Sequence, residues 1–135
     1  MIGIPTLLDI SPTNLSDLDE RDAYQHFFGK SLAEAKELFG QGDFYVNDLG
    51  WMGEGAFKFY INAYIDYLND CNLSELDIVL PMGLVMTGFA VHDNHDDLMV
   101  LIDKISDLRD KSLRGDAGFE REYDEVVGKI MKGRE

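Results

Sequence analysis

Residues 44–68, FYVNDLGWMGEGAFKFYINAYIDYL, form the stretch that decides the fold, because they hold the only tryptophan and seven of the fourteen other aromatic residues. From Ala56 onward the apolar residues recur at the spacing that places side chains on one face of an α-helix. They are Phe57, Tyr60, Ile61, Tyr64, Ile65 and Leu68. Only Lys58, Asn62 and Asp66 make a polar stripe, so other elements are expected to cover this helix on most sides. Residues 56–68 are therefore predicted to be the central helix.

The rest of the chain carries mainly helix signals. Further helices are predicted over residues 17–28, 31–39, 81–91, 96–114 and 119–130. Gly29 is expected to end the first of these, and Ser31 with Glu34 forms a capping box at the start of the second. Ser74 and Asn94 are predicted caps further on. For residues 78–91 a buried strand is the alternative, since Ile78, Val79 and Leu80 favour strands; helix is preferred.

Two segments are predicted to be non-helical. Residues 1–13 are expected to form an extended arm over the core, because this segment combines five isoleucine and leucine residues with two prolines, Pro5 and Pro12. Residues 42–55 are rich in Gly, Asn and Asp and are expected to form a packed loop that buries Trp51. The predicted fold class is thus mainly α: a compact single-domain bundle of about five or six helices around the aromatic helix at residues 56–68, with an extended N-terminal arm.

Length and charge narrow the class of protein. A chain of 135 residues is near the commonest size of one domain, and 45% hydrophobic residues are ample for a core. The formal net charge of -14 repels phosphate backbones and anionic lipids, so direct binding to nucleic acid or to a membrane is not expected. Cys71 is the only cysteine, and no signal peptide is recognisable at the N-terminus. The predicted location is the cytoplasm.

The acidic surface is the main functional prediction. Residues 1–92 carry fourteen acidic and four basic residues. A surface of this kind selects cationic partners and accelerates their association. The residues predicted to bind a cationic protein are Asp17, Asp19, Glu20, Asp22, Glu34, Glu37, Asp43 and Asp48.

No sequence pattern predicts a catalytic residue or a cofactor. A nucleophile elbow and the H-E-x-x-H zinc motif are absent, and Cys71 follows Asp70, which disfavours a reactive thiolate. The alternative is a metal-dependent or small-ligand enzyme built on residues 92–97, where imidazole and carboxylate groups crowd together. Its predicted ligands are His92, Asp93, His95 and Asp96. A second alternative is a structural subunit of an oligomer, and the oligomeric state is left open.

A resemblance gives the binding hypothesis a more specific form. The run from Asp48 to Gly53, followed by Ala56, Phe57 and Tyr60, is similar to a segment of small uncharacterised acidic bacterial proteins, some of which look like toxin-immunity proteins. The resemblance implies a fold and carries no catalytic residue. Together with the charge, it leads to the prediction of a non-enzymatic immunity protein that masks a basic toxin domain.

Overall fold

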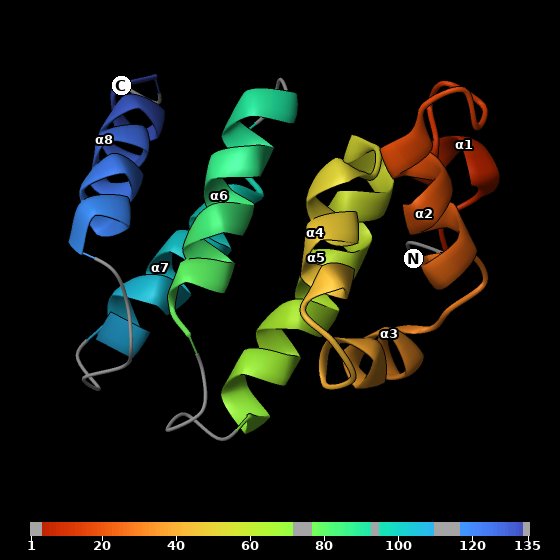
Figure 1. Cartoon of the computed structure of the whole chain (residues 1–135), viewed down its shortest axis with the longest axis horizontal. Helices are drawn as coiled ribbons and strands as arrows, with labels where there is room; N and C mark the ends of the chain where they lie inside the picture. Colours follow the sequence, from red (N-terminus) through yellow and green to blue (C-terminus); the bar gives the residue numbers. More distant parts are fainter. Residues whose placement is uncertain (1–3, 72–76, 93–94, 110–116, 134–135) are drawn as a thin grey trace. The chain divides into compact units, whose positions relative to one another are not determined.

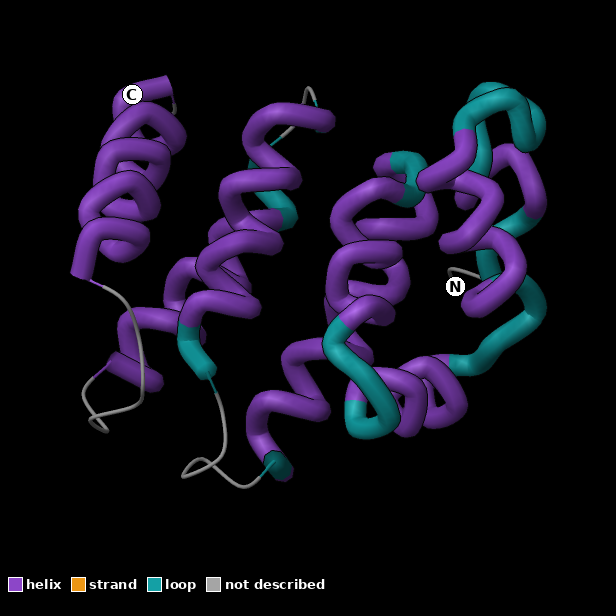
Figure 2. Tube along the Cα trace, viewed as in Figure 1, coloured by secondary structure: helices purple, strands orange, loops and turns teal. Residues whose placement is uncertain are grey.

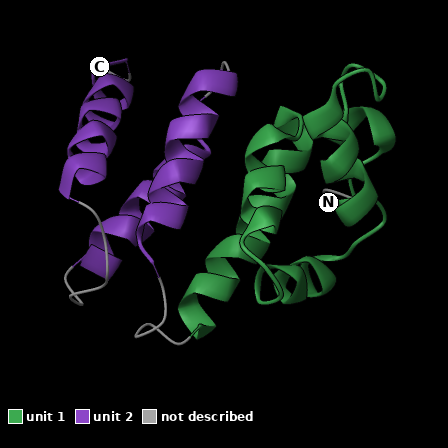
Figure 3. Ribbon diagram, viewed as in Figure 1, with its two compact units in different colours: residues 1–71 green, residues 72–135 purple. Residues whose placement is uncertain are grey.

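The computed structural model describes residues 4–71, 77–92, 95–109 and 117–133, which form eight helices and no β-strand (Figure 2). The prediction of a mainly α fold is confirmed. The chain divides into two compact units, residues 1–71 and 72–135 (Figure 3). The single domain stays a prediction.

Unit 1 contains the predicted central helix and four others. They are α1 (Leu7–Ile10), α2 (Leu18–Phe27), α3 (Leu32–Phe39), α4 (Phe44–Trp51) and α5 (Glu54–Asp70) (Figure 1). Helix α5 packs against α1, α3 and α4, and α2 packs against α1 and α4. The expectation that neighbouring elements cover most sides of α5 is confirmed within this unit.

The caps of α2 and α3 follow the sequence signals. The Asp17 carboxylate accepts a hydrogen bond from the Glu20 backbone N–H at the start of α2. Ser31 and Glu34 form the predicted capping box of α3, each accepting a bond from the other's backbone N–H. Gly29, which follows the last residues of α2, has φ +77°, a conformation that glycine adopts without strain.

Two expectations for unit 1 were wrong. The N-terminal segment is not extended throughout, because a capping box between Thr6 and Asp9 starts the short helix α1. The predicted loop at residues 42–55 contains helix α4, whose inward side buries Val46, Leu49 and Gly50. These two helices account for the higher helix count.

The core of unit 1 is an aromatic cluster between α2, α3 and α5. The ring of Phe27 lies 5.2 Å from Tyr60 and 5.7 Å from Phe39, and Phe39 lies 5.0 Å from Tyr64. All four side chains are buried, as is Phe57. The Tyr60 hydroxyl lies 2.8 Å from both the Phe27 and Lys30 carbonyl oxygens, so its proton has an acceptor inside the core. Burial raises the pKa of Tyr60 to about 12.

Unit 2 contains α6 (Val79–Val91), α7 (Leu98–Arg109) and α8 (Ala117–Gly133), and α6 packs against both of the others. The preference for helix over strand at residues 78–91 is confirmed. Pro81 stands in the first turn of α6, where its missing N–H costs no intrahelical hydrogen bond. The predicted caps Ser74 and Asn94 lie outside the described residues. Among the described residues, no helix combines the length and apolar character needed to span a bilayer.

Candidate functional site

Trp51 is on the surface, contrary to the prediction that it is buried. Its side chain is 42% exposed, because the helical period of α4 sets it opposite the inward residues Val46, Leu49 and Gly50. The predicted packed loop has no helical period, so it gave no reason to expect Trp51 on the surface. The only tryptophan of the chain is therefore available for binding.

The outward side of α4 presents a stripe with two aromatic residues. Phe44, Asn47 and Trp51 stand at i, i+3 and i+7, which places them along one side of the helix, and all three are exposed. The Phe44 side chain is 51% exposed. Aromatic side chains contribute much of the binding energy of protein–protein interfaces, so this stripe is a candidate binding surface.

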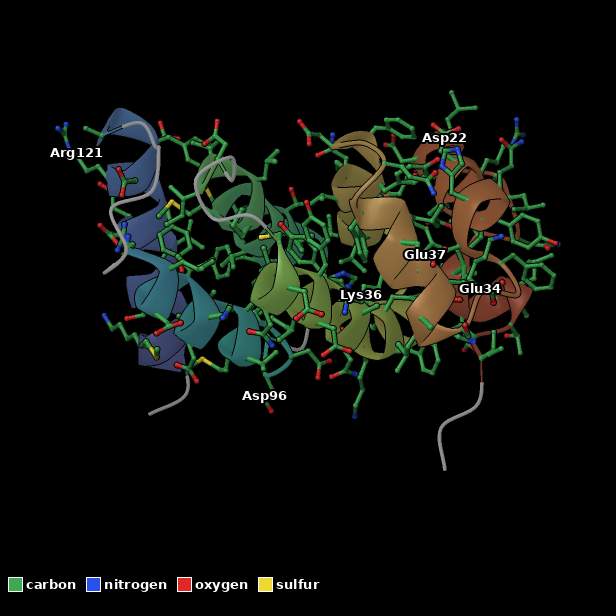
Figure 4. All side chains as sticks on the ribbon, turned by 90° about the horizontal axis from the view of Figure 1, so that it is seen from below. Asp22, Glu34, Lys36, Glu37, Asp96 and Arg121 are labelled. Carbon is green, nitrogen blue, oxygen red and sulfur yellow. The ribbon has the colours of Figure 1, made fainter. Side chains whose placement is uncertain are left out.

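Helix α2 lies beside α4 and carries a matching acidic stripe. Asp19, Asp22 and His26 also stand at i, i+3 and i+7, and Asp22 can be found on α2 in Figure 4. The His26 ring lies 5.6 Å from Phe44, and its Nδ1 lies 2.5 Å from the Asp48 carboxylate. We call the six exposed or half-exposed residues of the two stripes the α2–α4 face: Asp19, Asp22, His26, Phe44, Asn47 and Trp51.

Asp48 supports this face from beneath. It is predicted to bind a partner, but it is only 8% exposed and pairs with His26, so in the structure it holds a supporting position between α4 and α2. Burial raises the pKa of Asp48, the hydrogen bond and charge of His26 lower it, and burial has the larger effect. The charges of Asp22 and Asp19 raise this pKa further.

The raised pKa predicts how Asp48 affects stability with pH. The folded state binds the Asp48 proton more tightly than the unfolded state does, so protonation stabilises the fold. This stabilisation grows as pH falls from neutral through the raised pKa of Asp48 toward 3.8, the ordinary pKa of an aspartate. Asp48→Asn removes this contribution. Urea unfolding at neutral pH and at about pH 5 is therefore expected to show that the variant loses stability relative to the parent on acidification. A variant that gains relative stability in acid would contradict the burial of Asp48.

The other predicted acidic residues divide into structural and unengaged carboxylates. Asp17 and Glu34 cap helices, as described above. The Glu20 carboxylate accepts hydrogen bonds from the Ser11 hydroxyl and from the Thr13 backbone N–H and hydroxyl. Within the described part of the chain, no hydrogen bond or ion pair engages four of them: Asp19, Asp22, Glu37 and Asp43. Glu37 and Glu34 lie on α3 and are apart from Asp22 in Figure 4.

The histidine segment, residues 92–97, is only partly described. His92 is 6% exposed and Asp96 is exposed, whereas Asp93 lies outside the described residues. His95 Nε2 lies 2.7 Å from the His92 carbonyl oxygen, and because a carbonyl only accepts, this nitrogen is the donor in that contact. Over the described ranges, no three His, Cys, Asp or Glu side chains are grouped to hold a metal ion. The metal site stays a prediction.

Unit 1 also has an apolar pocket that the sequence did not reveal. Its volume is about 380 Å³, and Ile4, Pro5, Leu7, Tyr24 and Phe28 contribute to its lining. None of the predicted site residues lines it. The pocket adds exposed apolar surface next to α2 but presents no charged side chain to a ligand.

No protein-family model, curated protein or solved structure matches this chain. The resemblance of the segment from Asp48 to Tyr60 to immunity proteins therefore stays a prediction.

Proposed function

We propose that this chain is a non-enzymatic protein that binds a cationic protein through the α2–α4 face. The observation that carries the proposal is the pair of exposed aromatic residues on α4 beside two unengaged carboxylates on α2. In its most specific form, the proposed partner is a toxin domain, and the chain is the immunity protein that neutralises it.

The composition of the face supports binding to protein more than plain solubility. Solubility requires charge, but it does not require Phe44 and Trp51 to be exposed on one side of α4. Aromatic side chains near the centre of a contact supply affinity, whereas surrounding charges steer the partner and fix its orientation. Residues 1–71 carry twelve acidic and four basic residues, which favours a cationic partner.

The proposed function predicts a specific effect of charge reversal. Asp19→Lys with Asp22→Lys is expected to abolish protection against a cationic toxin domain encoded next to the gene of this chain, because like charges would then face each other. Folding should be retained, since neither carboxylate accepts a hydrogen bond in the described structure. Asp19 stands in the first turn of α2, so its reversal costs about 1 kcal/mol at most through the helix dipole. Glu20 is left unchanged because its hydrogen bonds hold the segment before α2. The readout is growth of cells that express the toxin together with each variant.

A matched control is available on α8. Glu122 and Glu125 are exposed, are also three residues apart on a helix, and give the same change in net charge when both become Lys. This control is expected to protect cells as the parent chain does. Equal loss of protection in the two double variants would mean that net charge alone is responsible. A gene neighbourhood without a toxin, and no rescue by co-expression, would contradict the immunity form of the proposal.

A further inference from the structure

We propose that the α2–α4 face recognises arginine side chains of its partner, with a guanidinium stacked on the ring of Trp51 or Phe44 and paired with Asp22 or Asp19. The proposal rests on the function proposed above and names the chemistry of the partner segment. Lysine is not an equivalent occupant.

The aromatic stripe provides the stacking surface. Phe44 and Trp51 are separated by two helical turns, so their rings lie on the same side of α4 about 10.5 Å apart along the axis. A planar guanidinium is weakly hydrated and stacks on such rings, whereas the ammonium of lysine is compact and strongly hydrated. Exposed rings with no charged neighbours would bind an apolar segment instead. The residues that border the aromatic stripe therefore decide which kind of partner binds.

Carboxylates border the stripe on the α2 side. Asp48 stands at i+4 from Phe44 and at i−3 from Trp51. Asp22 and Asp19 lie one and two turns before His26 on α2, and the His26 ring is 5.6 Å from Phe44. Asp48 is buried and engaged by His26, so Asp19 and Asp22 are the carboxylates that remain for a partner. A carboxylate pairs with the guanidinium fork through two parallel hydrogen bonds, which lysine cannot reproduce.

The same combination occurs within unit 2 of this chain. The Arg109 guanidinium lies over the Tyr123 ring, 5.2 Å from its centre, and its Nη1 donates to the Asp124 carboxylate at 2.8 Å. The Glu120 carboxylate lies 3.6 Å from Arg109 Nε. The α2–α4 face of unit 1 has the aromatic rings, on α4, and the carboxylates, on α2. The partner would supply the arginine.

Two peptides test the proposal on the intact chain. They are alanine-based, equal in length and charge, and differ only in carrying arginine or lysine at the same positions. Because Trp51 is the only tryptophan, its fluorescence reports on this face alone. The arginine peptide is expected to change the Trp51 emission and to bind about fivefold more tightly than the lysine peptide in calorimetry.

Substitutions separate stacking from charge. Trp51→Leu combined with Phe44→Leu keeps apolar bulk but removes both rings, and it is expected to reduce the preference for arginine to less than about twofold. An unchanged urea midpoint would show that this variant is folded. Asp19→Lys with Asp22→Lys is expected to weaken binding of both peptides, whereas the Glu122→Lys, Glu125→Lys control retains it.

The possible failures are distinguishable. Equal affinity for the two peptides, with both weakened by Asp19→Lys and Asp22→Lys, would overturn the arginine inference and leave the proposed function standing. If the Asp19→Lys, Asp22→Lys variant binds both peptides as tightly as the parent chain does, the α2–α4 face is not the binding surface, and the proposed function fails as well. If light scattering shows self-association and Trp51 emission changes with protein concentration, a second copy of this chain covers the face, and the inference is overturned.

Discussion

Phe57→Ala is expected to lower the free energy of unfolding by about 3–5 kcal/mol. Phe57 is 2% exposed and lies on α5, which packs against three other helices of unit 1. Truncation of its ring removes buried apolar contacts and leaves a cavity that the surrounding helices fill only in part. Since domains of this size are stabilised by about 5–15 kcal/mol, the loss is a large fraction of the total. Urea unfolding followed by circular dichroism gives the measurement.

Phe44→Ala is the matched control for this prediction. The substitution is chemically identical, but the Phe44 ring is half-exposed on α4. Its cost to stability is expected to stay below about 1 kcal/mol, and its effect should fall on binding. A larger loss of stability in Phe44→Ala than in Phe57→Ala would contradict the division between the core of unit 1 and the α2–α4 face.

Gly53→Ala is expected to cost about 3 kcal/mol or more, because the added methyl group has no space. A Cβ at Gly53 would lie 2.3 Å from the Asp9 carbonyl oxygen and 2.7 Å from Pro12 Cγ. The Gly53 backbone N–H also donates to the Ile10 carbonyl oxygen at 2.9 Å, so the N-terminal segment cannot move away without losing this bond. The effect is measured as a fall in the urea midpoint.

Gly128→Ala provides the opposite expectation. Gly128 lies in α8, its φ is not in the left-handed region, and nothing lies within 4 Å of its added Cβ. Alanine is expected to stabilise this helix by up to about 1 kcal/mol, because glycine loses more backbone entropy on folding. Similar destabilisation in both variants would contradict the claim that the close approach of Asp9 and Pro12, which Gly128 lacks, decides the cost at Gly53.

The main helices of the fold were predictable because their signals are local. The apolar period after Ala56 and the capping box of Ser31 and Glu34 depend on residues within one or two helical turns. Helix α4 was missed because Asn47, Asp48 and Gly50 favour turns on their own. Buried contacts of Val46 and Leu49 outweigh that preference in the folded chain. Local propensity cannot account for such contacts.

The site was less predictable for the same reason. The acidic surface follows from composition, but the roles of its members depend on distant partners. His26 meets Asp48 across 22 residues of sequence, and Glu20 is held by Ser11 and Thr13 from the segment before α2. Neither contact has a local signature, so sequence alone could not separate Asp48 and Glu20 from Asp19 and Asp22. The exposure of Trp51 could not be predicted either, because it follows from the helical period of α4, and α4 was not predicted.

The central claim is that the α2–α4 face, and not the net charge of the chain, recognises a cationic protein. The most direct test is the dissociation constant of the cationic toxin domain for the two double charge reversals, measured at physiological ionic strength. Asp19→Lys with Asp22→Lys is expected to weaken binding by at least about tenfold, while Glu122→Lys with Glu125→Lys is expected to change it by less than about twofold. Equal weakening by the two pairs would contradict the claim.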